Sequence, residues 1–302
     1  MTKHIRIVSP SGVMDPSYID GATERLRSWG FAVSEGHHTR DALGRFAGTD
    51  ADRLADLTDA LADPSVDMIL CSRGGYGLQR IVDRIPAVTK PILGFSDITA
   101  LHQLAGLNGQ SSLHSVMCKH IATLPADGEV LQAFRAALAG EELNYSLPAH
   151  PLNRCGEIAA PIVGGNLSVL YGLQGTPYDL SSISDFKSQI SNLPKPILFI
   201  EDIGERHYHI DRMMRNLRLS GVLARLGGLI VGQFSDCDDD PLMPAQTVYR
   251  TIYESVADYA YPVVFDFPCG HVERNLPIWL HQPATLTVTP DHSKLTISPP
   301  IR

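Results

Sequence analysis

The sequence predicts an α/β protein in two parts, first a parallel sheet with helices on both faces, then an α/β part that ends in antiparallel strands. Strand-like and helix-like segments alternate through the first half, and a polar, proline-bearing stretch follows near residue 140. Two segments of alternating hydrophobicity lie near the C-terminus. With 302 residues, of which 44% are hydrophobic, the chain can build two cores.

The first half reads as an alternation of strands and helices. Asp15-Pro16 supplies a cap and a first-turn proline for the first helix. Leu54, Leu57 and Leu61 recur at helical spacing and form one apolar face. The expected elements are a strand at Ile5–Val8, a helix from Asp15-Pro16 to about Trp29-Gly30, a strand at Phe31–Val33, a helix at Asp50–Leu61, strands at Met68–Cys71 and Ile92-Leu93, and a helix at Ala100–Ala105.

Two loops follow strands of this expected sheet. Ser72–Gly77 contains three glycines after one strand, and Gly94–Thr99 forms a strand-to-helix turn after the next, with Ser96 on the turn. Ligands of parallel sheets bind outside the carboxyl ends of the strands, so both loops lie where a site is expected. The glycines match neither the phosphate-loop nor the dinucleotide pattern, and a tight turn with exposed backbone N–H groups is the safer interpretation.

The polar stretch divides the chain into an N-terminal domain (1–139), a linker (140–156) and a C-terminal domain (157–302). The C-terminal domain is expected to mix parallel strands, helices and a final antiparallel pair. Its expected elements are a strand at Ile158–Val163 that breaks at glycines into a helix, strands at Ile197–Ile200, Gly228–Gly232 and Val263–Phe265, helices at Tyr208–Leu219 and Ala245–Val256, and antiparallel strands at Thr285–Thr289 and Lys294–Ser298.

Composition excludes several classes of function. The net charge of -8, the pI of 5.8 and the absence of a basic run argue against binding to nucleic acid or to an acidic membrane. The segment Met1–Val8 is too polar for a secretory signal, and no apolar run reaches the roughly 18 residues of a membrane helix. Five scattered cysteines without a C-x-x-C pair indicate reduced thiols. We therefore expect a soluble, cytoplasmic protein.

A serine on a strand-to-helix turn suits nucleophilic catalysis. The nucleophile needs a base, and the base needs a carboxylate that orients it. Glu201 follows four apolar residues at a strand end, and His271 lies in a loop just after a strand. Ser96, Glu201 and His271 occur in the Ser, acid, His order of the α/β-hydrolases. Ile98 stands where a nucleophile elbow has its second glycine, so simple helix capping by Ser96 or Asp97 is the alternative.

The other candidates have competitors of their own. Asp202 competes with Glu201 by residue type, Glu201 could instead pair with Arg206 or Arg212, and His271 is one of twelve histidines. Three segments could suggest a metal site, but none has the full ligand spacing of a known one, and we expect no metal. These segments are His37-His38, His207–His209 and the acidic run Asp236–Asp240.

Taken together, the motifs resemble those of the LD-carboxypeptidase family of serine peptidases. They occur in the family's order and span nearly the whole chain. The matching stretches are Ser9–Gly12, Arg45–Thr49, Arg73–Gly77, Gly94–Thr99, Gly164–Leu167, Glu201–Ile203 and Asp266–His271. The chain departs from the family's pattern at Ser115-Val116 and at Val163, positions that bear on substrate details and not on the reaction class.

The resemblance implies a role for each matching residue. It implies that Ser96 is the nucleophile, His271 the general base and Glu201 the carboxylate that orients this base. The implied oxyanion hole consists of the backbone N–H groups of Gly75 and Asp97. The residues expected to bind substrate are Arg73, Gly74, Tyr76 and Asn166, and Arg73 is the candidate for the terminal carboxylate because a guanidinium can bind it bidentately.

The resemblance also implies the fold and the reaction. It implies a flavodoxin-like or Rossmann-like N-terminal half, a smaller C-terminal α/β domain, a site in the cleft between them, and a homodimer. We expect no cofactor. The implied reaction releases terminal D-alanine from L,D-linked muropeptide tetrapeptides in peptidoglycan recycling. Two alternatives stay open: a related immunity-type hydrolase of peptide-nucleotide antibiotic conjugates, and a non-catalytic Rossmann-like binder of small molecules.

Overall fold

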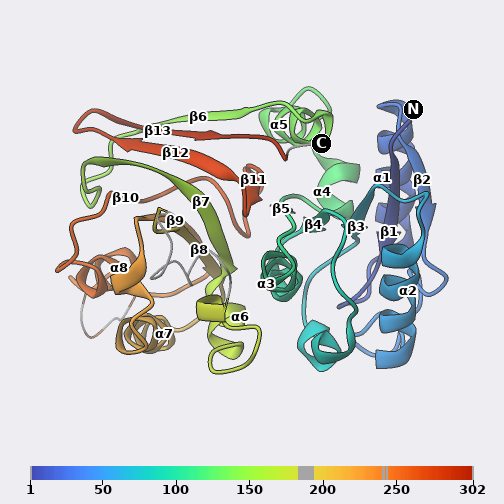
Figure 1. Cartoon of the computed structure of the whole chain (residues 1–302), viewed down its shortest axis with the longest axis horizontal. Coiled ribbons are helices and arrows are strands. Elements are labelled where there is room, and N and C mark those ends of the chain that lie inside the picture. Colours follow the sequence, from blue (N-terminus) through green and yellow to red (C-terminus); the bar gives the residue numbers. More distant parts are fainter. Residues whose placement is uncertain (1, 183–193, 240–241, 243, 301–302) are drawn as a thin grey trace. The chain divides into compact units, whose positions relative to one another are not determined.

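The computed structural model describes residues 2–182, 194–239, 242 and 244–300. The chain forms two compact units, each with its own sheet (Figure 1). Unit 1 comprises Met1–Arg135 and Leu276–Ile278, and unit 2 comprises Ala136–Asn275 and Trp279–Arg302. A short segment late in the sequence therefore belongs to the first unit, which a division at one linker does not anticipate.

Unit 1 is built on a six-stranded sheet in the order β11-β5-β4-β3-β1-β2. The pairs from β2 to β5 are parallel, and the order of the first five strands is that of flavodoxin-like folds. This confirms the parallel α/β arrangement predicted from sequence. The strands are β1 (His4–Val8), β2 (Ala32–Glu35), β3 (Met68–Cys71), β4 (Ile92–Gly94), β5 (Ser112–His114) and β11 (Ile278–Leu280).

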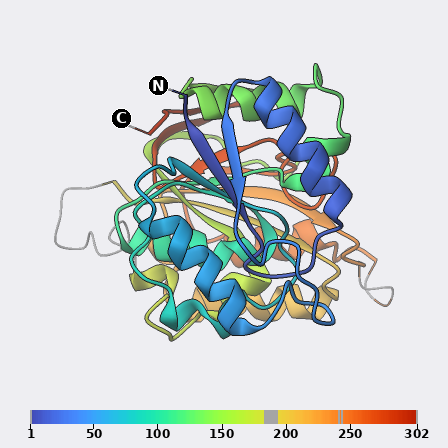
Figure 2. The same ribbon diagram turned by 90° about the vertical axis from the view of Figure 1, so that its right-hand side faces the viewer.

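The helices of unit 1 connect these strands. Both faces of the sheet are covered, since α1 and α2 lie on opposite sides of β1 and β2 (Figure 2), as right-handed crossovers require. Every residue of β3 and β4 is accordingly buried. The helices are α1 (Pro16–Ser28), α2 (Asp50–Ala62), α3 (Thr99–Leu107) and α4 (Cys118–Thr123), with 3₁₀ turns η1 (Leu78–Arg80), η2 (Val82–Arg84) and η3 (Ser96–Ile98); α5 (Glu129–Ala139) begins in unit 1 and ends in unit 2.

Helix starts in unit 1 follow the capping signals of the sequence. Asp15 accepts a hydrogen bond from the Ser17 backbone N–H at the start of α1. Thr49 and Asp52 form a capping box at the start of α2. Two leucines of the predicted apolar stripe of α2, Leu57 and Leu61, are buried and Leu54 is half-buried, and the buried face also includes the charged residues Arg53 and Asp56.

Unit 2 has a seven-stranded sheet in the order β10-β9-β8-β7-β12-β13-β6. Strands β7 to β10 pair in parallel, and β12, β13 and β6 continue the sheet in antiparallel fashion, so the predicted C-terminal antiparallel pair is confirmed. The elements are β6 (Leu143–Pro148), β7 (Gly156–Asn166), α6 (Leu167–Gly172), η4 (Leu180–Ser182), β8 (Ile197–Ile203), α7 (His207–Leu219), η7 (Leu223–Arg225), β9 (Gly228–Ser235), α8 (Val248–Ser255), β10 (Val263–Val264), β12 (Pro283–Val288) and β13 (His292–Ile297).

Strand β6 lies inside the segment that the sequence suggested as a linker. Leu143, Tyr145 and Leu147 alternate with exposed residues and pack into unit 2, while β6 pairs with β13. With this added strand, unit 2 has the larger sheet and is not the smaller part that was expected. Among the described residues, no helix is long and apolar enough to cross a membrane.

Candidate active site

Ser96 occupies the turn that follows β4, as predicted. Its backbone φ is +69°, a left-handed conformation that costs free energy for a residue other than glycine. Strained conformations of this kind cluster at functional sites, because only a well-determined surrounding structure maintains them. Gly94, two residues before Ser96, could not carry a side chain without strain, because its φ is +153° and an added Cβ would lie 3.1 Å from Ile98. Ile98, at the sequence position of the second glycine of a nucleophile elbow, therefore packs against Gly94.

The helix-capping alternative does not describe this turn. Phe95 is the N-cap of η3 and Ile98 that of α3, and neither helix start has a side-chain capping bond. The Asp97 carboxylate instead accepts hydrogen bonds from the hydroxyl of Ser11 and from the backbone N–H of Leu78. The turn is therefore held by contacts to two other loops of unit 1.

The glycine loop after β3 lies against Ser96. A Cβ added to Gly74 would lie 2.7 Å from the Ser96 Cβ and 2.9 Å from the Phe95 carbonyl oxygen, so only glycine fits there. Gly75 has a φ of +101°. In the part of the chain that the structure describes, the backbone N–H groups of Gly75 and Asp97 donate no hydrogen bond. Unit 1 thus presents a serine beside two unused backbone donors.

Unit 2 brings Glu201 and His271 together. The Nδ1 of His271 lies 2.8 Å from the Oε2 of Glu201, and the Glu201 side chain is fully buried. A carboxylate only accepts hydrogen bonds, so Nδ1 carries the proton and donates it. Gly270 allows this approach, since a Cβ there would lie 2.9 Å from the same carboxylate oxygen.

Charge and burial shift the pKa of the His271 imidazole in opposite directions. Burial lowers the pKa of the imidazole, but the hydrogen bond and the negative charge of Glu201, together with the charge of Asp202, raise it, and the net shift is upward. A half-buried histidine that is hydrogen-bonded to one carboxylate and lies near the charge of a second has the environment of a general base.

Asp202, the competitor of Glu201, has a different role. Its carboxylate accepts hydrogen bonds from the Asn166 side chain at 3.0 Å and from the backbone N–H and hydroxyl of Ser168 at 2.9 and 2.6 Å. Burial, with a contribution from the charge of Glu201, raises the pKa of Asp202 to about 6. The two carboxylates of β8 therefore have different partners: Glu201 bonds to His271, and Asp202 bonds to residues at the start of α6.

The residues expected to bind substrate lie in both units. Arg73 is exposed and donates through Nη1 to the carbonyl oxygen of Val13 at 2.9 Å. Tyr76 is 49% exposed. Asn166 is buried, caps α6 through its Oδ1 and donates to Asp202, so its side chain supports the helix start; a substrate role for it stays a prediction.

The arginines that could have competed for Glu201 do not pair with it. Among the described residues, no ion pair joins Glu201 to Arg206 or Arg212. Arg212 instead lies over the ring of Tyr208, with its guanidinium carbon 5.4 Å from the ring centroid.

The histidine and aspartate clusters suggested by the sequence do not form metal sites within the described chain. His38 of the first segment lies instead in a group with Asp41 and Asp52, whose potential ligand atoms are within 4.8 Å of one another. In this group, His38 already bonds to Asp41, and Asp52 to the capping threonine of α2. Part of the acidic run Asp236–Asp240 lies outside the described residues.

Comparison with known proteins matches this chain over most of its length. Models of the LD-carboxypeptidase N-terminal and C-terminal domains match residues 5–115 and 159–286. A relative in Synechocystis sp., named as a putative carboxypeptidase, is 35% identical, and the match covers 91% of this chain and 88% of the relative. The murein tetrapeptide carboxypeptidase of Pseudomonas aeruginosa is 26% identical over 90% of this chain and 89% of its own.

Solved structures show the same fold. The muramoyltetrapeptide carboxypeptidase from Oxalobacter formigenes has a TM-score of 0.86 at 24% identity, covering 99% of this chain and 100% of that one. The microcin C7 self immunity protein MccF has a TM-score of 0.82 at 18% identity, covering 99% and 97%. Because two domain models together match far more than half of the sequence, the chain belongs to the LD-carboxypeptidase family and is, as predicted, a carboxypeptidase.

Proposed function

We propose that this protein is a serine LD-carboxypeptidase that releases terminal D-alanine from L,D-linked muropeptide tetrapeptides in peptidoglycan recycling. The observation that carries the proposal is the hydrogen bond of His271 to a fully buried Glu201. A carboxylate without solvent is costly unless a partner compensates it, and this partner is the one that serine catalysis requires. The family membership and the murein peptidase of Pseudomonas aeruginosa support the substrate class.

The proposed chemistry uses Ser96 as nucleophile. His271 accepts the proton of the Ser96 hydroxyl through Nε2 as the serine oxygen attacks the carbonyl carbon of the amide bond that joins an L-centre residue to D-alanine. The negative oxygen that forms is stabilised by the N–H groups of Gly75 and Asp97. His271 then donates its proton to the nitrogen of D-alanine as the C–N bond breaks. Water, activated by the same histidine, hydrolyses the acyl-enzyme and restores the serine.

A carboxypeptidase must recognise the free carboxylate at the end of its substrate. Arg73 is our candidate, because it is exposed at the glycine loop beside Ser96 and a guanidinium keeps several donors when one binds Val13. Gly74, Tyr76 and Asn166 complete the proposed contacts. We further propose that the enzyme works without a cofactor, as a cytoplasmic homodimer.

A second candidate is an immunity-type hydrolase that cleaves peptide-nucleotide antibiotic conjugates. This candidate stays open because the chain shares its fold with MccF. A likeness at 18% identity concerns the fold alone. Such an enzyme would use the same catalytic groups and differ in its preference for the leaving portion of the substrate. The non-catalytic alternative is set aside, because the chain is a carboxypeptidase.

The test compares three substrates at equal concentration: an L,D-terminated tetrapeptide, a D,D-terminated pentapeptide and an aminoacyl-nucleotide conjugate. We expect D-alanine release from the tetrapeptide alone. Preferred cleavage of the nucleotide conjugate would support the second candidate, and release from the pentapeptide would contradict the L,D specificity.

A further inference from the structure

Three loops of unit 1 meet at the carboxyl ends of neighbouring parallel strands. Ser9–Gly12 follows β1, Arg73–Gly77 follows β3, and Gly94–Thr99 follows β4. The first two loops are joined directly, because the backbone N–H of Gly12 donates to the carbonyl oxygen of Gly74 at 3.0 Å. The spacing between the N–H groups of Gly75 and Asp97 therefore depends on what holds these loops together.

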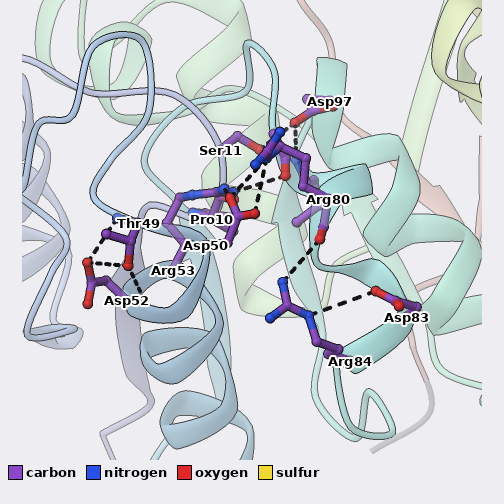
Figure 3. A network of polar contacts seen from close by, with 12 residues as sticks. Pro10, Ser11, Thr49, Asp50, Asp52, Arg53, Arg80, Asp83, Arg84 and Asp97 are labelled. Carbon is purple, nitrogen blue, oxygen red and sulfur yellow. Dashed lines mark hydrogen bonds and ion pairs between the residues drawn. The ribbon is translucent and has the colours of Figure 1, made fainter.

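One carboxylate oxygen joins all three loops. The Oδ2 of Asp97 accepts from the Ser11 hydroxyl at 2.7 Å and from the Leu78 backbone N–H at 2.9 Å (Figure 3 shows the contact with Ser11). Asp97 is only 3% exposed, and burial raises the pKa of its carboxyl. The two hydrogen bonds thus compensate the cost of burying the ionised Asp97 carboxylate. They also connect the end of the glycine loop to the residue that follows Ser96.

A buried arginine holds the same loops from the side of α2. The Nη1 of Arg53 donates to the carbonyl oxygens of Pro10 at 2.7 Å and Gly77 at 3.0 Å (Figure 3 shows Arg53 beside Pro10). The Arg53 side chain is fully buried. Its Nη2 pairs with Asp50, which also accepts from Arg80. Gly77 has a φ of +133°, and a Cβ there would lie 3.0 Å from the Arg53 Nη1, so the loop closes tightly on the guanidinium.

We propose that the Asp97 carboxylate and the Arg53 guanidinium are positioning residues that set the distance between the two backbone donors of the oxyanion hole. The inference rests on the proposed function, and neither side chain touches the substrate. Donors stabilise an oxyanion only if they are fixed before the reaction, and a displacement of about 1 Å can cost on the order of 10² in rate. Burial of both charged groups in one loop junction follows from this requirement for rigidity.

The experiment measures two rates in full-length protein. One is the covalent modification of Ser96 by a fluorophosphonate, whose reaction also develops negative charge on an oxygen; the other is D-alanine release from an L,D-terminated tetrapeptide. The variants are Asp97→Asn, Arg53→Met and the milder Ser11→Ala. The matched controls are Asp56→Asn, which changes a buried carboxylate that binds the His38 N–H, and Arg154→Met, which changes an arginine that holds two carbonyl oxygens in unit 2.

We expect Asp97→Asn and Arg53→Met to lower the phosphonylation rate and kcat by about 10- to 100-fold, while KM changes by less than about threefold. The controls are expected to lose comparable thermal stability and keep both rates. Rates for Asp97→Asn and Arg53→Met no lower than those of the controls would overturn the inference. If these two variants do not fold, the Ser11→Ala variant is the test, because it removes one hydrogen bond to Asp97. Wild-type rates in Ser11→Ala would then overturn the positioning role of Asp97.

The same data separate this inference from the proposed function. Wild-type protein that is modified at Ser96 but releases no D-alanine would contradict the substrate proposal, while the phosphonylation rates of the variants still test the positioning role. Wild-type protein that shows neither reaction would overturn both.

Discussion

The Nδ1 of His271 lies 2.8 Å from the Oε2 of Glu201, and the glutamate is fully buried in unit 2. Such a contact fixes both the tautomer and the orientation of the imidazole, leaving Nε2 as the nitrogen that would receive a proton from a nucleophile. If this pair drives catalysis, its two members should differ in how strongly their loss affects the reaction.

Removing the base should have the larger effect. His271→Ala is expected to lower kcat by about 10³–10⁶-fold, because nothing then accepts the serine proton. Glu201→Gln keeps the shape of the side chain but disturbs the tautomer, and we expect a loss of about 10²–10⁴-fold. Steady-state D-alanine release measures both, and a His271→Ala variant with wild-type kcat would contradict the role of the histidine.

The pH dependence should report the charge around His271. The imidazole acts as a base only when neutral, and its pKa is raised, so kcat/KM should fall as the pH drops through this raised value. Asp202→Asn and Glu201→Gln each remove a negative charge that raises the pKa, and they should move the acid limb to lower pH. Asp63→Asn changes a half-buried carboxylate of unit 1 that pairs with Arg6; it serves as the control and should leave the limb unchanged.

Glycines of the loop can be tested against a matched position. Gly75→Ala forces a residue with a side chain into a φ of +101°, and Gly30→Ala does the same at +93° with no atom within 4 Å of the new Cβ. Each change should cost about 1–2 kcal/mol of stability from backbone strain. Only Gly75→Ala should also lower kcat, because it moves a proposed oxyanion donor. Equal activity in the two variants would argue against Gly75.

Thiol reactivity should follow burial. Cys71, Cys118 and Cys269 are buried, and burial raises the pKa of each thiol. Burial also raises the pKa of Cys237 to about 11, while Cys155 is exposed. A disulfide reagent should therefore modify Cys155 fast and the others slowly in native protein, and Cys155→Ser should abolish the fast phase. Fast modification of a buried cysteine would contradict the packing described here.

Local patterns in the sequence were sufficient for much of the fold. Alternating segments predicted the parallel sheet of unit 1 and the antiparallel strands of unit 2, because short buried strands and capped helices leave strong local signals. The turn at Ser96 and the glycine loop were found in the same way. Local signals do not specify distant partners, and so the pairing of β11 with the sheet of unit 1 was not predicted.

Arg53 shows why part of the site was missed. The leucine stripe predicted for α2 was right for Leu57 and Leu61, which are buried, but apolar spacing gives no signal for Arg53 and Asp56, which share the buried face. A charged residue is buried only when tertiary structure supplies its partners, here two loop carbonyl oxygens. The choice between Glu201 and Asp202 likewise needed the structure, because both residue types fit the sequence.

The most direct test of the account is mass spectrometry of the protein quenched during turnover of an L,D-terminated tetrapeptide. We predict an acyl adduct on the peptide that contains Ser96, lost in Ser96→Ala together with D-alanine release. D-alanine release by Ser96→Ala at the wild-type rate, or an adduct on another residue, would contradict the central claim that Ser96 is the nucleophile.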